Sequence, residues 1–368
     1  MYLSMPFLFA LFTKRYARYR QLAALCGAVL ASTSFVISSF STHIWHLVIT
    51  QGVLAALGCA LIYSTTTLSL GEWFNTKNRI CNRAVAYGIA MSAKNIVGSA
   101  CPFMFQALLD RYSFRTTLRV WAIIAFGSAI FSIFMIPTPV QSTSSSTHQA
   151  RKISWLFLRH QTFYIYTIAI LLQSTGYGIP TTYLSTYGSN IALLSSTYAA
   201  LLLTLISVPG IASSYLFSFL SDNKHYPMSV SAVTALSAIT SALCTFFLWG
   251  FAVQGSLALL TLYAISYGFF ANGYSGTWGG MVNEMEREAR QKNEAIDPGL
   301  IYGLLNGVRG AGYVIGGIVS VPLIQAGNKG PVGRFGYGTT YGPLIIFTGI
   351  TLAFGGWGLM WKWAKALR

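Results

Sequence analysis

The chain has 368 residues, of which 54% are hydrophobic and only 9% are charged, and its formal net charge is +16. A soluble globular fold is excluded, because this small number of polar groups could not cover the surface of a soluble protein of this length. The positive charge does not indicate nucleic-acid binding, because the basic residues are spread over many loops and form no basic face of a folded domain. The five cysteines predict no disulfide framework.

Ten apolar runs are each long enough to cross a membrane as a helix, which takes about 20 residues. The runs are, in chain order, about Leu22–Phe40, Ile44–Leu70, Ala84–Leu109, Thr117–Ile136, Phe163–Thr186, Ser195–Leu220, Ser229–Trp249, Leu257–Met281, Leu300–Gln325 and Gly342–Trp363. An apolar segment before them, Tyr2–Thr13, would form only about 18 Å of helix. Its basic residues follow the apolar part, which does not fit a signal peptide. We expect it to be a spanning helix whose outer end is missing.

Lysine and arginine concentrate in alternate loops between these runs. Seventeen of the 24 basic residues stand in one set of loops and in the tail: Lys14, Arg15, Arg18, Arg20, Lys77, Arg79, Arg83, Arg151, Lys152, Arg159, Lys224, Arg287, Arg290, Lys292, Lys362, Lys365 and Arg368. The other set holds five: Arg111, Arg115, Arg119, Lys329 and Arg334. Helices that cross a membrane back and forth, with Lys and Arg kept on the cytoplasmic side, produce this pattern. It predicts a multi-pass membrane protein whose C-terminus is cytoplasmic.

The longest polar stretch, Pro137–Gln161, is rich in Ser and Thr and is typical of a flexible linker. It predicts three parts: an N-terminal helical bundle of five helices at 1–136, a cytoplasmic linker at 137–162, and a six-helix bundle at 163–368. The expected fold class is an all-α multi-pass membrane protein with about 11 transmembrane helices. The odd division suggests two six-helix halves of which the first helix is absent.

Short motifs at a characteristic order and spacing indicate a family. They are the basic run Lys14–Arg20, Thr50-Gln51-Gly52, Glu72-Trp73-Phe74, Leu109-Asp110-Arg111-Tyr112-Ser113-Phe114-Arg115, Leu220-Ser221-Asp222, Tyr267-Gly268-Phe269-Phe270 and Arg309-Gly310. Together they resemble the fungal monocarboxylate-transporter-like branch of the major facilitator superfamily, from the start of the chain to about Gln325. The resemblance implies a major-facilitator fold of two six-helix bundles, a central cavity and transport by alternating access.

Two departures limit what the resemblance implies. The family has twelve helices, and we expect the first of them, which lines the cavity in that fold, to be missing from this chain. Animal monocarboxylate porters place an Asp and an Arg, as proton and substrate site, in the helix that corresponds to Ser195–Leu220, and this segment contains neither. Proton-coupled transport of the lactate type is therefore not expected.

Lys94 and Arg309 are the basic residues at membrane depth, each about ten residues, or about 15 Å, from the cytoplasmic end of its run. Ionisable groups at that depth are costly and usually face a cavity or a partner. The resemblance puts the two residues in equivalent helices of the two halves, facing each other across the pseudo-twofold axis, where such repeats bind substrate. We expect a receptor for a carboxylate or an acidic phenol. The alternatives are an arginine that donates to backbone carbonyls and a lysine that snorkels or stays neutral.

Polar and aromatic side chains complete the predicted site. Asn95, Gln173 and Asn272 can hydrogen-bond a substrate, although hydrogen bonds between helices explain each of them as well. Tyr177 and Tyr267 lie in helices that line the cavity in the resembled fold, and they would suit a flat, aromatic solute. The predicted substrate-binding residues are therefore Arg309, Lys94, Asn95, Gln173, Tyr177, Tyr267 and Asn272.

The acidic residues and the histidines all stand outside the middle of the apolar runs. A proton-driven carrier normally has a titratable group in the membrane, and here only Lys94 would serve. Facilitated diffusion, or coupling through the substrate's own proton, fits the sequence at least as well. The segment Glu284–Glu294 predicts a solvated loop helix. The spacing of Gly303, Gly307, Gly312 and Gly316 indicates close helix packing and no nucleotide loop.

These observations favour a secondary membrane transporter that moves a small organic anion or a hydrophobic metabolite. An efflux carrier for a secondary metabolite, and a truncated transporter-like sensor or remnant without transport activity, are the alternatives. No zinc-protease, serine-hydrolase or Walker motif is present, so we expect no enzyme, no metal and no cofactor. The expected partners are a small-molecule substrate and membrane lipids, with no nucleic acid. We expect a monomer, in the plasma membrane rather than in a vacuolar or other internal membrane.

Overall fold

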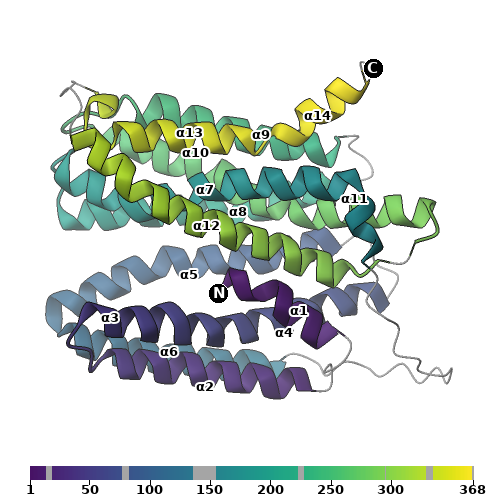
Figure 1. Ribbon diagram of the computed structural model, residues 1–368. Helices are drawn as coiled ribbons and strands as arrows, with labels where there is room; N and C mark the ends of the chain where they lie inside the picture. The colour runs from purple at the N-terminus through teal and green to yellow at the C-terminus, as the bar shows by residue number, and fades with distance from the viewer. Residues whose placement is uncertain are drawn as a thin grey trace. The chain divides into compact units, whose positions relative to one another are not determined.

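The computed structural model describes residues 1–13, 19–76, 83–135, 155–222, 228–294, 296–328 and 335–366, and within these ranges every regular element is a helix (Figure 1). The α-helices are α1 (Met5–Thr13), α2 (Arg20–Ser38), α3 (Ile44–Leu47), α4 (Ala56–Thr76), α5 (Arg83–Arg111), α6 (Phe114–Met135), α7 (Gln161–Asn190), α8 (Ser196–Asp222), α9 (Val230–Cys244), α10 (Leu257–Gly276), α11 (Trp278–Gln291), α12 (Pro298–Asn328), α13 (Gly342–Phe354) and α14 (Trp357–Ala366). The prediction of an all-α chain with about 11 spanning helices is confirmed.

Among the described residues, six helical spans are both long and strongly apolar, and the bent pair of α13 and α14 makes a seventh if it is counted as one span. Helices α5, α7 and α10 are also long, at 29, 30 and 20 residues, but they are not among those six. These three helices carry Lys94, Gln173 and Asn272. Six of the seven predicted site residues thus stand on less apolar helices, as is expected of helices that face a cavity or one another. Arg309, in contrast, stands on α12, which is one of the six strongly apolar spans.

Four predicted runs are divided in the structure. The second run, Ile44–Leu70, contains a π-helical segment at Val48–Ala55, and the run Ser229–Trp249 ends in another at Thr245–Trp249. The run predicted at Leu257–Met281 is two helices, because α10 ends at Gly276 and α11 begins at Trp278. The last run bends by 44° between α13 and α14. At this bend a Cβ on Gly355 would lie 2.8 Å from the Cβ of Gln173, so the chain needs a glycine to pass α7.

Some predicted features lie outside the described residues. These are Lys14–Arg18 of the basic run, the side chains of Glu72, Trp73 and Phe74, and the linker from 137 to 154. At the end of the linker the structure resumes with a 3-10 turn, Leu156–Arg159, and α7 begins at Gln161.

The described chain forms two compact units. Unit 1 comprises Met1–Arg83, Met104–Trp155 and Ala295–Gly307, and unit 2 comprises Ala84–Phe103, Leu156–Glu294 and Val308–Arg368. Helices α5 and α12 therefore each contribute to both units. All seven predicted substrate-binding residues belong to unit 2.

Close packing at small residues shapes both units. In unit 1, α2 packs on α4 and α6, and a Cβ on Gly58 would lie 2.6 Å from the carbonyl oxygen of Gly27. In unit 2, α7 packs on α8 and α13, while α10 packs on α8 and α9 (Figure 1). Helix α12 lies directly on α7, because a Cβ on Gly312 would come within 2.7 Å of the carbonyl oxygen of Leu171. A Cβ on Gly303, Gly307 or Gly316 would come as close, within 2.6 Å of Phe9, Pro6 or Thr175, respectively. The close packing predicted for these three glycines and for Gly312 is therefore confirmed.

Candidate functional site

Arg309 on α12 lies in an aromatic cage, which we define as the rings of Tyr177, Trp278 and Tyr313. The guanidinium carbon is 5.0, 5.2 and 5.4 Å from the three ring centroids, respectively. Its Nη2 donates a hydrogen bond of 3.1 Å to the hydroxyl of Tyr313. Only 4% of Arg309 is exposed. Each ring attracts the cation by about 0.5–2 kcal/mol, so the cage holds a buried, permanently charged group.

Lys94 on α5 approaches the same cage. Its Nζ lies 5.9 Å from the centroid of the Tyr177 ring, and the residue itself is exposed. The structure therefore brings the two predicted cations to one tyrosine.

Tyr177 is held in place by two of the other predicted residues. Its hydroxyl donates to Oδ1 of Asn272 at 2.6 Å, and its backbone carbonyl accepts from the hydroxyl of Tyr267 at 2.9 Å. The Nδ2 of Asn272 donates to the carbonyls of Ile206 and Gly268, at 3.1 and 2.9 Å. Asn272 and Tyr267 thus make hydrogen bonds between helices and orient the ring on which the cations lie.

The Asn272 amide also lies against α8, next to a proline of that helix. Pro209 lies inside this helix and cannot donate a backbone hydrogen bond. A Cβ on the next residue, Gly210, would lie 2.8 Å from Nδ2 of Asn272 and 2.7 Å from Nδ2 of Asn95. Asn95 donates to the hydroxyl of Ser214 at 3.2 Å. Both amides therefore connect α8 to its neighbours.

Gln173 is the predicted site residue farthest from this arrangement. It is buried on α7, with 4% exposed, and its Cβ and Cγ face Gly355 at the bend between α13 and α14. The described contacts do not bring it to the cage.

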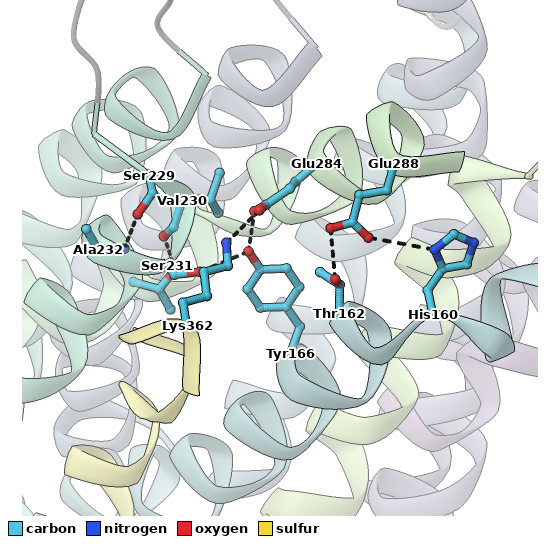
Figure 2. Close-up of polar contacts among 11 residues, drawn as sticks. His160, Thr162, Tyr166, Ser229, Val230, Ser231, Ala232, Glu284, Glu288 and Lys362 are labelled. Atoms are coloured by element: carbon cyan, nitrogen blue, oxygen red, sulfur yellow. Dashed lines mark hydrogen bonds and ion pairs between the residues drawn. The ribbon is translucent and has the colours of Figure 1, made fainter. Parts of the chain in front are cut away.

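A second polar cluster lies at the start of α7 (Figure 2). We call it the end cluster and define it as His160, Thr162, Tyr166, Glu284, Glu288 and Lys362. The carboxylate of Glu284 accepts a short hydrogen bond from the hydroxyl of Tyr166 and is 2.6 Å from Nζ of Lys362. The carboxylate of Glu288 accepts from Thr162 at 2.9 Å and is 3.7 Å from Nδ1 of His160. The cluster joins α7, α11 and α14.

Two parts of these sites were not predicted. The segment Glu284–Glu294 was expected to be a solvated loop helix, but its residues Met285 and Ala289 are buried and its glutamates are only partly exposed. Tyr313 was also missed, although it stands one helical turn after Arg309, at the spacing where side chains on a helix meet. Among the described residues, no group of three His, Cys, Asp or Glu could hold a metal ion.

The sequence is similar to a large family and to individual transporters. The model of the Major Facilitator Superfamily matches residues 1–317. Monocarboxylate transporter 12 of Xenopus laevis is 26% identical over 280 residues, which cover 69% of this chain and 58% of that protein. The human protein of the same name is 25% identical over 285 residues, covering 69% and 54%. An MFS-type transporter of Gibberella moniliformis is 24% identical over 272 residues, covering 73% and 62%. The chain thus spans little more than half of the length of these relatives.

The fold is similar to that of a solved bacterial transporter. A crystal structure of the E. coli fucose:proton symporter superposes with a TM-score of 0.65 at 14% sequence identity, and it covers 98% of this chain and 88% of that one. At this identity the likeness concerns the fold alone.

Proposed function

We propose that this chain, which belongs to the Major Facilitator Superfamily, is a secondary carrier that moves small organic anions across a membrane by alternating access. The observation that carries the proposal is the buried guanidinium of Arg309 within its aromatic cage, with Lys94 at the same ring. The relatives are transporters, which supports a carrier rather than an enzyme.

The chemistry of the cage suits a carboxylate. A guanidinium stays protonated at any physiological pH and presents a planar fork of N–H donors that matches the two oxygens of a carboxylate. A bound carboxylate would accept hydrogen bonds from this fork, and the rings of Tyr177 and Trp278 would pack against the flat part of the solute.

The helices around the cage have the features that alternating access needs. Prolines lie inside α7 and α8, at Pro180 and Pro209, and such positions allow carrier helices to bend. We propose that the moving parts are the two predicted bundles, 1–136 and 163–368, connected by the linker. Transport would proceed by facilitated diffusion, or by coupling to the substrate's own proton.

We place the C-terminus in the cytoplasm and the carrier in the plasma membrane, as a monomer. The excess of Lys and Arg in alternate loops supports the orientation. An epitope tag after the C-terminus should be accessible to antibody only after the cells are permeabilised, and staining of intact cells would reverse the assignment.

Uptake by the purified chain in liposomes tests the proposed function. The probes are radiolabelled benzoate, phenylacetate and lactate. Arg309→Gln should lower anion uptake by about 100-fold, because a charge-assisted hydrogen-bonded contact is lost, while Arg309→Lys should keep part of it. The matched control is Arg119→Gln. Arg119 also contacts a ring, that of Phe40 at 4.8 Å, and a hydroxyl, that of Ser39 at 3.1 Å, but it belongs to unit 1.

Two results would contradict the proposal. Equal uptake by folded Arg309→Gln and wild type would remove the assigned site. Absence of flux above empty liposomes for every probe would favour the sensor or remnant alternative.

A further inference from the structure

A cleft lies between α7 and α12 in unit 2, on the side of the cage away from the start of α7. It has a volume of about 120 Å³, which is room for about four water molecules at about 30 Å³ each. Its walls include Thr175, Thr182 and Tyr183 from α7, and Tyr313, Gly317 and Ser320 from α12.

At its inner end, by which we mean the end nearest Arg309, the cleft is lined by one ring of the aromatic cage, that of Tyr313. Tyr313 lines the cleft and accepts the hydrogen bond from Arg309. Its ring meets the ring of Tyr177 edge to face, with centroids 6.0 Å apart. One tyrosine therefore separates the cleft from the buried guanidinium.

The far end is crossed by a hydrogen bond between helices. The hydroxyls of Tyr183 and Ser320 lie 2.9 Å apart. Elsewhere along the cleft the two backbones touch, because a Cβ on Gly316 would lie 2.2 Å from the carbonyl oxygen of Thr175. A Cβ on Gly317 would meet nothing within 4 Å. The space of the cleft is thus opened by Gly317 and bounded by contacts that hold the helices at a fixed distance.

The walls attract water more than anions. The hydroxyls of Thr175, Thr182 and Ser320 donate to carbonyls of their own helices, so they present oxygen acceptors to the cleft. Acceptors hydrate a passage but do not bind a carboxylate. Any preference of the cleft for anions must then come from the positive charge at its inner end.

We infer that this cleft is a hydrated vestibule through which small carboxylate-bearing solutes reach Arg309, and that Tyr313 decides which solutes pass. The inference rests on the proposed function, and it adds a route and a specificity-determining residue. When the solute arrives, its carboxylate replaces the Tyr313 hydroxyl at Nη2 of Arg309, and the tyrosine ring remains as the side wall.

Charged thiol reagents test the vestibule without requiring transport. Gly317→Cys is made in a chain whose five native cysteines are replaced by serine, and the protein is placed in lipid nanodiscs, which leave both membrane faces open. The matched control is Ile318→Cys, the next residue, whose side chain is 67% exposed and points about 100° away around the helix. Reaction rates with anionic and cationic methanethiosulfonates are divided by their rates with a free thiol.

The anionic reagent should modify Cys at position 317 faster than the cationic one. Position 317 is about 12 Å along α12 from Arg309, and a unit charge at that distance changes the rate by about tenfold at an effective dielectric constant of about 20. The preference should disappear with Arg309→Gln, and Ile318→Cys should react with neither reagent. Modification at 317 should also slow anion uptake.

Three outcomes would overturn the inference: no reaction at position 317, no preference for the anionic reagent, or a preference that persists with Arg309→Gln. If Gly317→Cys does not fold, Thr182→Cys on the opposite wall is the second reporter, with the same expectations. If the cysteines are labelled as expected but no probe is taken up, the vestibule is supported and the carrier proposal is overturned. If uptake depends on Arg309 but the cysteines are not labelled, the carrier proposal is supported and the vestibule is overturned.

Discussion

The aromatic cage and the end cluster both put cations next to tyrosine, and they differ in what else is present. Lys94 lies 5.9 Å from the ring of Tyr177, and Lys362 lies at the same distance from the ring of Tyr166. Lys362, however, also contacts the carboxylate of Glu284 at 2.6 Å. Arg309 in the cage contacts three rings and the hydroxyl of Tyr313. We assign the end cluster to the stability of the fold and the cage to the proposed anion site.

A carboxylate introduced into the cage would make the cage resemble the end cluster, and we expect it to have the largest effect on anion uptake. We expect Tyr313→Glu to form an ion pair with Arg309 and to lower anion uptake by about 100-fold, because the solute must then displace a charged partner. Tyr313→Gln, of the same size without the charge, is the control and should retain far more uptake. Similar uptake by the two variants would mean that the charge of Arg309 does not recruit the solute.

The carboxylate of the end cluster should matter for stability and little for substrate affinity. Glu284→Gln should lower the free energy of unfolding by about 1–3 kcal/mol, because Tyr166 and Lys362 both lose a charged partner. Unfolding of the purified chain in detergent measures this. The control is Glu286→Gln, whose partner Arg290 is one turn away and 58% exposed, a pair expected to contribute about 0.3–0.5 kcal/mol. Equal losses from both variants would contradict a specific role for the cluster.

Removal of single tyrosine hydroxyls should have the smallest effect and should separate the two regions. Tyr177→Phe loses the hydrogen bond to Asn272 but keeps the ring, so we expect a 2- to 10-fold weaker apparent affinity, about 0.5–1.5 kcal/mol. Tyr166→Phe should lower stability and leave the affinity unchanged. Concentration-dependent uptake by the two variants gives the comparison, and a reversed pattern would exchange the roles of cage and cluster.

The helices and the cations could be predicted from the sequence, because both depend on local patterns. Apolar length gave the spans to within a few residues, and the cost of charge in a membrane singled out Lys94 and Arg309. The roles of Asn272 and Tyr267 could not be decided in this way. An amide at membrane depth serves a solute or a neighbouring helix equally well, and only the packing of α7, α8 and α10 shows the partners that it has.

The end cluster was missed for a related reason. Charged residues near the end of a span usually stay in water, so the sequence does not predict a contact between Glu284 and Lys362. Their contact depends on the division of the run at Thr277 and on the bend at Gly355, which redirect α11 and α14. Neither break has a strong signal in an otherwise continuous apolar sequence.

The π-helical segment Val48–Ala55 has a consequence for how this chain tolerates changes of length. In a π-helix each backbone hydrogen bond joins residues that are five apart in sequence, one more than in an α-helix. Deletion of Gly52, where an added Cβ would meet only Val48 at 3.9 Å, could be absorbed as the wide turns become α-helical ones. Deletion of one residue of α2 before Gly27 would rotate every later residue of that helix by about 100° relative to its start. Gly27 would then lose its contact with Gly58. Natural length variants of this span should therefore concentrate at Val48–Ala55.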